Sequence, residues 1–207
     1  MPNLSLEISL QARGFLRIAG VDEAGRGPLA GPVAAAAVIL PLKFRCRGLD
    51  DSKKLPAPER ERLYEKITNH PRVVWAFAIA SCEEVDRLNI LRATHLAMRR
   101  AVESLPDAPH HCLIDGLPVR DFPFPHDGIV KGDGRSLSIA AASIIAKVRR
   151  DRIMAELHDE YPHFGFARHK GYGTKEHLEA LRIHGPCCHH RRSFEPVAQL
   201  TLPLGGV

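Results

Sequence analysis

Residues 18–28 read IAGVDEAGRGP: a short apolar run passes directly into two acidic residues and then into a glycine-rich turn. The apolar run predicts a buried β-strand over residues 15–21, and the next apolar run predicts a second strand over residues 33–40. Asp22 and Glu23 follow the first strand immediately, where a carboxylate costs stability unless it has a partner or a function. This stretch therefore predicts both the start of a sheet and the start of a functional site.

The two acidic neighbours also constrain the strand that carries them. Successive residues of a regular strand point to opposite faces, so Asp22 and Glu23 cannot both face one site from a straight strand. We therefore expect the strand to end or kink at these residues. Gly25 and Gly27 supply the backbone freedom for such a change of direction.

The rest of the chain alternates apolar runs with amphipathic segments. Further strands are predicted over residues 73–80 and 112–115, and helices over residues 58–70, 88–105, 139–146 and from the N-cap Thr174 to a stop at Gly185. With 207 residues, 44% apolar and 26% charged, the composition fits one globular domain and excludes a disordered, collagenous or coiled-coil protein. We expect an α/β protein with a mixed sheet and a more helical C-terminal portion.

Two of these helices carry a clear burial pattern. The apolar stripe of the first falls within an arc of about 100° and predicts a core-facing side made of Leu88, Leu91, Met98, Val102 and Leu105. The helix over residues 139–146 is apolar on almost every side and should be buried. Residues 147–152 are then expected to emerge into solvent.

Four acidic residues stand at the ends of core elements. Asp115 follows the apolar run at residues 112–114, and Asp133 lies between two glycines, so both resemble Asp22 and Glu23 in their placement. Like charges that converge raise one another's pKa and destabilise the fold, so such a cluster persists where cations neutralise it. Carboxylate ligands suit Mg²⁺ or Mn²⁺, although each acid by itself is equally compatible with an ordinary turn cap.

The charge balance adds to this interpretation. The chain carries 29 Lys and Arg against 24 Asp and Glu, a net charge of +5. If four carboxylates gather at one point, the remaining surface is more positive still, which suits a phosphate backbone held beside an acidic, metal-filled centre. Two-metal nucleases have this electrostatic layout.

Seven segments, in this order along the chain, resemble the signature blocks of bacterial ribonuclease HII. They are residues 19–28 (AGVDEAGRGP), 51–55 (DSKKL), 113–116 (LIDG), 131–133 (KGD), 141–148 (AASIIAKV), 169–172 (HKGY) and 189–194 (HHRRSF). The resemblance implies a ribonuclease H-like mixed sheet flanked by helices. It also implies an endonuclease that hydrolyses the RNA strand of RNA/DNA hybrids and cuts 5′ to ribonucleotides embedded in duplex DNA, leaving a 3′-hydroxyl and a 5′-phosphate, with roles in DNA replication and repair.

The resemblance also implies residue roles. The catalytic, metal-binding acids of the family correspond to Asp22, Glu23, Asp115 and Asp133, holding two Mn²⁺ or Mg²⁺ ions. The family's substrate-binding residues correspond to Gly25, Arg26 and Gly27, which read the ribose 2′-hydroxyl, to Lys53 near the substrate backbone, and to Tyr172, which stacks on the following sugar. Where family members often have a polar residue after the Asp-Gly pair, this chain has Leu117.

The sequence also leads to expectations about domain organisation, cellular location and oligomeric state. We expect a single catalytic domain over residues 1–207, with a ribonuclease H-like core over residues 15–157 and a basic helical portion over residues 158–207 that contributes to substrate binding. The N-terminus lacks a secretory pattern and no stretch is long enough to span a membrane, so we expect a cytoplasmic protein. We expect a monomer without an obligate protein partner, and residues 201–207 show no recognisable docking tail.

Two other functions remain open at this point. A metal nuclease of the same fold would cut all-DNA substrates, and a non-catalytic hybrid-binding protein would keep the basic surface without the chemistry. Among lesser signals, the five cysteines are predicted to be reduced thiols, and residues 187–190 (CCHH) are too closely spaced to wrap one zinc ion. Ser143 is predicted to be structural.

Overall fold

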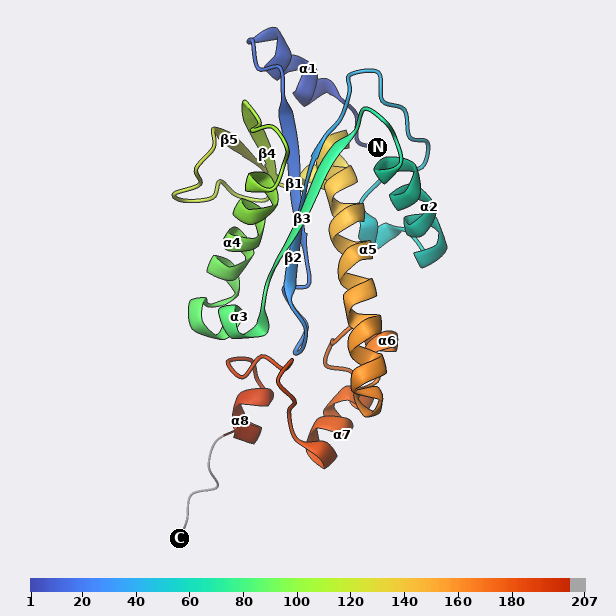
Figure 1. Ribbon diagram of the computed structural model, residues 1–207, viewed down its shortest axis with the longest axis vertical. Helices are drawn as coiled ribbons and strands as arrows, with labels where there is room; N and C mark the ends of the chain where they lie inside the picture. The colour runs from blue at the N-terminus through green and yellow to red at the C-terminus, as the bar shows by residue number, and fades with distance from the viewer. Residues whose placement is uncertain (202–207) are drawn as a thin grey trace.

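The computed structural model describes residues 1–201 and has a five-stranded mixed sheet with helices on both faces (Figure 1). The strands are β1 (Ile18–Ala24), β2 (Val33–Ile39), β3 (Val74–Ala80), β4 (His111–Asp115) and β5 (His126–Ile129). Their order is β3-β2-β1-β4-β5, with β1–β2 and β2–β3 antiparallel and β1–β4 and β4–β5 parallel. The α/β class predicted from the sequence is confirmed.

The helices form two layers around this sheet and a cluster beyond its end. They are α1 (Ser5–Ala12), α2 (Ala57–Thr68), α3 (Cys82–Leu88), α4 (Ile90–Glu103), α5 (Leu137–Glu160), α6 (Phe166–His169), α7 (Lys175–His184) and α8 (Val197–Thr201), with short 3₁₀ turns η1 (Ser52–Lys54), η2 (Gly132–Gly134) and η3 (Pro162–Phe164). In Figure 1, α3 and α4 lie on one side of the sheet, α2 and α5 on the other, and α6, α7 and α8 gather beyond one end. None of the helices within residues 1–201 is both long and apolar enough to cross a bilayer.

Strand β2 shows why two helical layers are needed. It reads VAAAAVI and nearly all of it is buried, so both of its faces need cover. Ala36 and Val38 pack with α2 and α5, whereas Ala35 and Ala37 pack with α4. The small side chains allow both helices to approach the strand closely, and Gly20 in β1 has the same effect, since a Cβ there would lie 2.2 Å from the backbone of α5 at Ser138.

The first strand extends further than the sequence predicted. The strand was expected to end or kink at Asp22 and Glu23, and this is wrong: both residues pair regularly with β2, opposite Ala36 and Ala35. The small alanine side chains of β2 allow the ladder to continue to Ala24. The Cβ atoms of the two acids therefore point to opposite faces of the sheet.

The predicted single helix over residues 88–105 is two helices. Asn89 breaks it with a positive φ of 70°, and its side chain caps α4 by accepting from the Arg92 amide. Leu91 of the predicted stripe is 50% exposed, because the buried face of α4 is centred on Ala93, Ala97 and Ala101. The prediction treated residues 88–105 as one continuous helix. Because the chain breaks at Asn89, the first turn of α4 is rotated relative to that prediction, and Leu91 faces solvent.

Helix α5 also differs from its prediction. It runs 24 residues, and of the segment 147–152 that was expected to emerge into solvent only Arg152 is exposed. Arg150 is 1% exposed. Helix α1 and strand β5 were not predicted, whereas the N-cap of α7 at Thr174, which accepts from the His177 amide, and its end at Gly185 were. Residues 202–207 of the predicted tail lie outside the described part of the chain.

Candidate active site

Three of the predicted acids converge at one end of the sheet. Strands β1 and β4 run parallel with Val21 opposite Ile114, so Asp22 and Asp115 follow at the same edge. Turn η2 contacts both β4 and the start of α5 and brings Asp133 to this edge. One carboxylate oxygen from each of the three residues lies within 4.8 Å of the others, the only such group of three metal-ligating side chains among residues 1–201. We call these three side chains the acidic cluster.

The main chain orients each carboxylate of the acidic cluster. The Glu23 amide donates to Asp22 Oδ1 at 2.7 Å, the Gly132 amide to Asp115 Oδ1 at 2.6 Å, and the Gly134 amide to Asp133 Oδ1 at 2.8 Å. One oxygen of each carboxylate is thus engaged by a backbone donor. The second oxygen of each is available to a cation.

The electrostatics of the acidic cluster call for positive charge. Burial raises the pKa of Asp22 well above its ordinary value, and the carboxylates of Glu23 and Asp115 raise it further. Burial and then Asp115 likewise raise the pKa of Asp133. The protein therefore holds these groups close together at a cost that a bound cation would relieve. An all-oxygen donor set of this kind fits a hard divalent ion such as Mg²⁺ or Mn²⁺.

The fourth predicted ligand, Glu23, is not part of the acidic cluster. Its carboxylate falls outside this group of three and accepts from Arg26 Nη1 at 3.3 Å. Burial raises the pKa of Glu23 against the opposing effect of Arg26, and the Asp115 charge adds to the rise, so the two carboxylates still sense each other. The regular course of β1 through Asp22 and Glu23 is the physical reason for this separation.

Two loops with exposed tips, at residues 26–27 and 172–173, carry the other predicted substrate-binding residues. The loop after β1 carries Gly25, Arg26 and Gly27, and Gly25 has a positive φ of 91° that favours glycine. A Cβ at Gly27 would lie 3.6 Å from the ring of Tyr172, which is 48% exposed, so the two predicted substrate-binding elements are neighbours. We call residues 25–32 the glycine loop and residues 169–173 the tyrosine loop.

A third element brings a cation to the site. Although burial opposes it, the carboxylates of Asp22, Asp51 and Asp133 raise the pKa of Lys53, which is held in η1. The hydroxyl of Ser143 on α5 donates to the hydroxyl of Ser52 at 2.8 Å and fastens this turn to the core. This contact fits the structural role predicted for Ser143, and the ammonium group of Lys53 stands beside the acidic cluster.

Other sequence signals have different outcomes. Leu117, the residue that departs from the family pattern, is 75% exposed two residues beyond Asp115. In the CCHH segment, His190 Nδ1 accepts from the Cys187 amide at 3.0 Å and its Nε2 contacts His177 Nε2 at 3.0 Å, so both of its ring nitrogens are already engaged within the fold. The five cysteines are free thiols, as predicted.

The sequence analysis missed two buried arginines, Arg150 and Arg191, which contact the glycine loop. Both stand in runs of basic residues, RRDR and HHRR, that read as solvated surface. The only available signal was that one of these runs belongs to the last signature block.

A mixed sheet with acids at the ends of its two central parallel strands, flanked by a glycine loop, defines a nuclease of the ribonuclease H-like fold. Solved structures agree: ribonuclease H2 from Pyrococcus horikoshii OT3 superimposes with a TM-score of 0.73 at 27% identity, covering 89% of this chain and 97% of that one. A ribonuclease HIII described as Bst-RNase HIII in complex with Mn²⁺ shares the fold, with a TM-score of 0.71 at 22% identity over 89% of this chain and 69% of that one.

Sequence comparison narrows the class to one family. The family described as ribonuclease HII matches residues 19–197. Ribonuclease HII of Desulfitobacterium hafniense (strain DSM 10664 / DCB-2) is 56% identical over 193 residues, 93% of this chain and 74% of that protein. Ribonuclease HII of Myxococcus xanthus is 56% identical over 204 residues, 98% and 69% respectively. The chain belongs to the ribonuclease HII family, and the family and fold support an endoribonuclease that acts on RNA/DNA hybrids.

Proposed function

We propose that this protein is a divalent-metal-dependent endonuclease that cuts the phosphodiester bond 5′ to a ribonucleotide, in RNA/DNA hybrids and at ribonucleotides embedded in duplex DNA. The products would carry a 3′-hydroxyl and a 5′-phosphate. The observation that carries the proposal is the meeting of three carboxylates within 4.8 Å beside the glycine loop and the tyrosine loop.

The acidic cluster would hold the metal ions. Asp22, on the central strand, would contact both of two Mg²⁺ or Mn²⁺ ions, and Asp115 and Asp133 would complete their ligand sets together with Glu23. Bound ions of this kind polarise the scissile phosphate and activate water. For Glu23 to join, its carboxylate has to leave Arg26, and the 3.3 Å contact between two partly exposed side chains is weak enough to exchange.

The surrounding residues would recognise the substrate. The Lys53 ammonium group would pair with a backbone phosphate, and the glycine loop would let main-chain groups approach the ribose, whose 2′-hydroxyl distinguishes RNA from DNA. The exposed ring of Tyr172 would stack on the sugar that follows the scissile step. Discrimination against all-DNA duplexes would come from the two loops together.

Further expectations concern the whole chain. We propose that residues 15–157 form the catalytic core and that residues 158–207 contribute to substrate binding within one domain. The protein would act as a monomer without an obligate protein partner. A cytoplasmic location and roles in DNA replication and repair stay predictions.

The test is cleavage of a labelled DNA duplex that contains one ribonucleotide, with an identical all-DNA duplex as the control. We expect cleavage with Mg²⁺ or Mn²⁺, none in excess chelator, and product ends that a ligase or a phosphatase identifies as 3′-hydroxyl and 5′-phosphate. Full activity in chelator would contradict the metal mechanism. Equal cleavage of the all-DNA duplex would identify a DNA nuclease, and tight binding without any cleavage would identify a hybrid-binding protein.

A further inference from the structure

Two buried guanidinium groups donate hydrogen bonds to main-chain carbonyls of the glycine loop. Arg191 is 0% exposed and Arg150 is 1% exposed, and neither forms an ion pair with an acidic residue in the part of the chain that the structure describes. Burying a cation without a counter-ion is costly unless every donor finds an acceptor. Here each guanidinium nitrogen has a backbone carbonyl as acceptor, and we call the two side chains the arginine clamp.

Arg191 contacts the residues on either side of the loop's tip. Its Nη2 donates to the carbonyl of Gly25 at 2.6 Å and its Nη1 to the carbonyl of Arg26 at 2.9 Å. Its Nε and Nη2 both donate to the carbonyl of Gly31, at 3.0 and 2.8 Å. One planar group thus ties the first and last parts of the glycine loop together.

Arg150 joins the glycine loop to the tyrosine loop. Its Nε donates to the carbonyl of Pro32 at 2.9 Å, its Nη2 to that of Ala30 at 3.2 Å, and its Nη1 to that of Lys170 at 3.1 Å. The last contact lies two residues before Tyr172. A Cβ at Gly25 would lie 1.9 Å from Arg150 Nε, so the glycine also makes room for the clamp.

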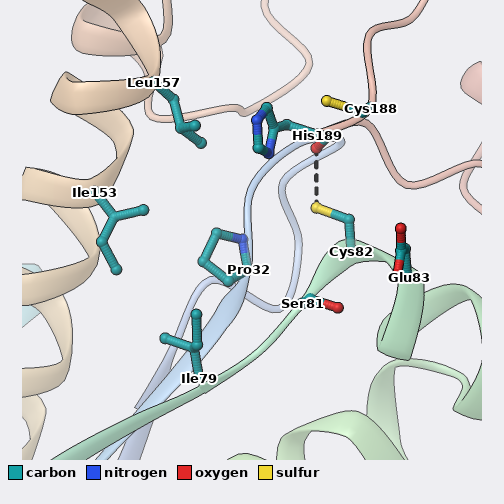
Figure 2. Close-up of a pocket in the computed structure, with 9 residues that line it drawn as sticks. All are labelled: Pro32, Ile79, Ser81, Cys82, Glu83, Ile153, Leu157, Cys188 and His189. Carbon is teal, nitrogen blue, oxygen red and sulfur yellow. Dashed lines mark hydrogen bonds between the residues drawn. The ribbon is translucent and has the colours of Figure 1, made fainter.

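The segment that delivers Arg191 is itself fastened. The thiol of Cys82 donates to the carbonyl of His189 at 2.9 Å, as Figure 2 shows beside Pro32. The Gly31 amide donates to the same carbonyl at 2.9 Å, and the Arg191 amide donates to the carbonyl of Leu29 at 2.8 Å. The base of the clamp is therefore rigid.

The clamp sets which side of two peptide units faces outward. In a trans peptide the N–H points away from the C=O. Because the carbonyls of Gly25 and Arg26 point to Arg191, the amides of Arg26 and Gly27 point the opposite way, and neither amide has a hydrogen-bond partner in the structure of residues 1–201. Two adjacent backbone donors are thus presented without a protein acceptor.

We propose that Arg191, supported by Arg150, is a positioning residue that turns the amides of Arg26 and Gly27 toward the ribose and aligns them with Tyr172, and so determines selectivity for a ribonucleotide followed by a deoxyribonucleotide. This inference rests on the proposed function. Neither clamp side chain touches the substrate in this scheme, and neither contacts the acidic cluster. Selectivity therefore depends on the clamp while metal binding does not.

The experiment compares Arg191→Lys with the parent and with Arg99→Lys. Lysine keeps the charge but cannot bridge three carbonyls from one planar group. Arg99 lies on the exposed surface of α4, where it contacts Glu103, so the same exchange there leaves the loop intact. Each protein is assayed for kcat/KM on a DNA duplex with one ribonucleotide and on a hybrid with a continuous RNA strand, and for Mn²⁺ affinity by calorimetry with the metal alone.

We expect Arg191→Lys to lose about 100-fold in kcat/KM on the single-ribonucleotide duplex, because a shift of about 1 Å in a positioning group costs this much. On the continuous hybrid we expect a loss of only about 10-fold. The Mn²⁺ affinity of Arg191→Lys should stay within about twofold of that of the parent. The activity of Arg99→Lys on both substrates should also stay within about twofold. A general loss of folding would lower kcat/KM on both substrates by the same factor. The ratio of the two kcat/KM values therefore separates an effect on positioning from an effect on stability.

A folded Arg191→Lys with the parent's substrate ratio would overturn the inference. If Arg191→Lys does not fold, Arg150→Lys takes its place, since it breaks the link to the tyrosine loop, and an unchanged ratio there has the same meaning. If the parent itself fails to cut the single-ribonucleotide duplex, the proposed function is wrong, and that result is independent of both variants.

Discussion

The acidic cluster and the arginine clamp differ in how their charge is compensated. The clamp places two cations in the interior, where burial and then the neighbouring Arg150 lower the pKa of Arg191 to about 10. Its donors are nonetheless taken up by backbone carbonyls of Gly25, Arg26 and Gly31. The acidic cluster has one backbone donor per carboxylate, and the nearby Lys53 offsets only part of its mutual repulsion.

This difference distinguishes buried charges that stabilise a local structure from buried charges that bind a ligand. A buried ion whose hydrogen bonds all close within the chain holds its surroundings in one arrangement. A group of like charges that the chain leaves only partly compensated lowers stability until cations arrive, as expected of a site that binds them. The clamp thus fixes the glycine loop, whereas the acidic cluster has the properties of a cation site.

The largest expected effect comes from removing a charge of the acidic cluster. We expect Asp22→Asn to reduce the single-turnover cleavage rate by about 1,000-fold or more while hybrid binding is largely retained, because the amide cannot hold two cations. The folded-state pKa of Asp22 is raised, so ionisation costs stability at pH values above the ordinary pKa of aspartate. Without metal at pH 7.5, the variant should therefore unfold at a higher temperature than the parent.

The matched control is Asp121→Asn, because Asp121 is exposed and its positive φ of 57° also suits asparagine. Both variants are measured by cleavage of the single-ribonucleotide duplex and by thermal unfolding in chelator. Parent-like cleavage by Asp22→Asn would remove the acidic cluster from the mechanism.

The second-largest effect should come from a substitution that displaces Arg150 of the arginine clamp. We expect Gly25→Ala to lower kcat/KM on the single-ribonucleotide duplex by about 100-fold, since its Cβ would meet Arg150 Nε at 1.9 Å. Gly14→Ala carries the same backbone penalty, with φ of 94° against 91°, but its Cβ would meet no atom within 4 Å. If the two variants lose activity equally, backbone strain alone explains the glycine.

A third prediction concerns the histidine pair behind the tyrosine loop. Burial lowers the pKa of His177 to about 4 and that of His190 to about 3. An unfolded histidine has a pKa of about 6.5, so between about pH 6.5 and 4 the unfolded state binds protons that the folded state excludes. From pH 7.5 to pH 5 we expect each histidine to lower the free energy of unfolding by about 2 kcal/mol, and the pair together by about 4 kcal/mol.

Replacing one member of the pair tests this assignment. His177→Asn can still donate to the carbonyl of Tyr172, which now accepts from His177 Nδ1 at 2.9 Å, but it no longer titrates. Its stability should depend less steeply on pH than that of the parent, while the exposed control His184→Gln should keep the parent's slope. Chemical unfolding at several pH values measures both, and parallel curves for all three proteins would reject the assignment.

The smallest effect should come from the exposed ring. We expect Tyr172→Ala to reduce the preference for a deoxyribose after the ribonucleotide by about 10-fold, because stacking on one nucleotide contributes about 1–3 kcal/mol. Tyr172→Phe keeps the stacking face and should stay near the parent. The measurement is the ratio of kcat/KM on duplexes with one and with several consecutive ribonucleotides. Equal ratios for the alanine variant and the parent would argue against stacking.

Much of the sheet and part of the site could be predicted from the sequence. The apolar runs located four of the five strands, the acids that follow two of these runs located Asp22 and Asp115, and Asp133 stood out between two glycines. The placement of Glu23 could not be predicted, because it depends on whether the alanines of β2 let the ladder continue past Asp22. Strand β5 (His126–Ile129) is too short and too polar to stand out as a pattern.

The amino-acid sequence by itself determined the fold class, the family and the residues that carry negative charge to the site, because each of these follows from local patterns and ordered motifs. Only the tertiary structure decided that Glu23 pairs with Arg26 outside the acidic cluster and that Arg150 and Arg191 are interior. Arg191 meets its carbonyl partners across 160 to 166 positions of the chain. Burial of a long charged side chain depends on acceptors supplied by distant segments, and no local pattern records where they will be.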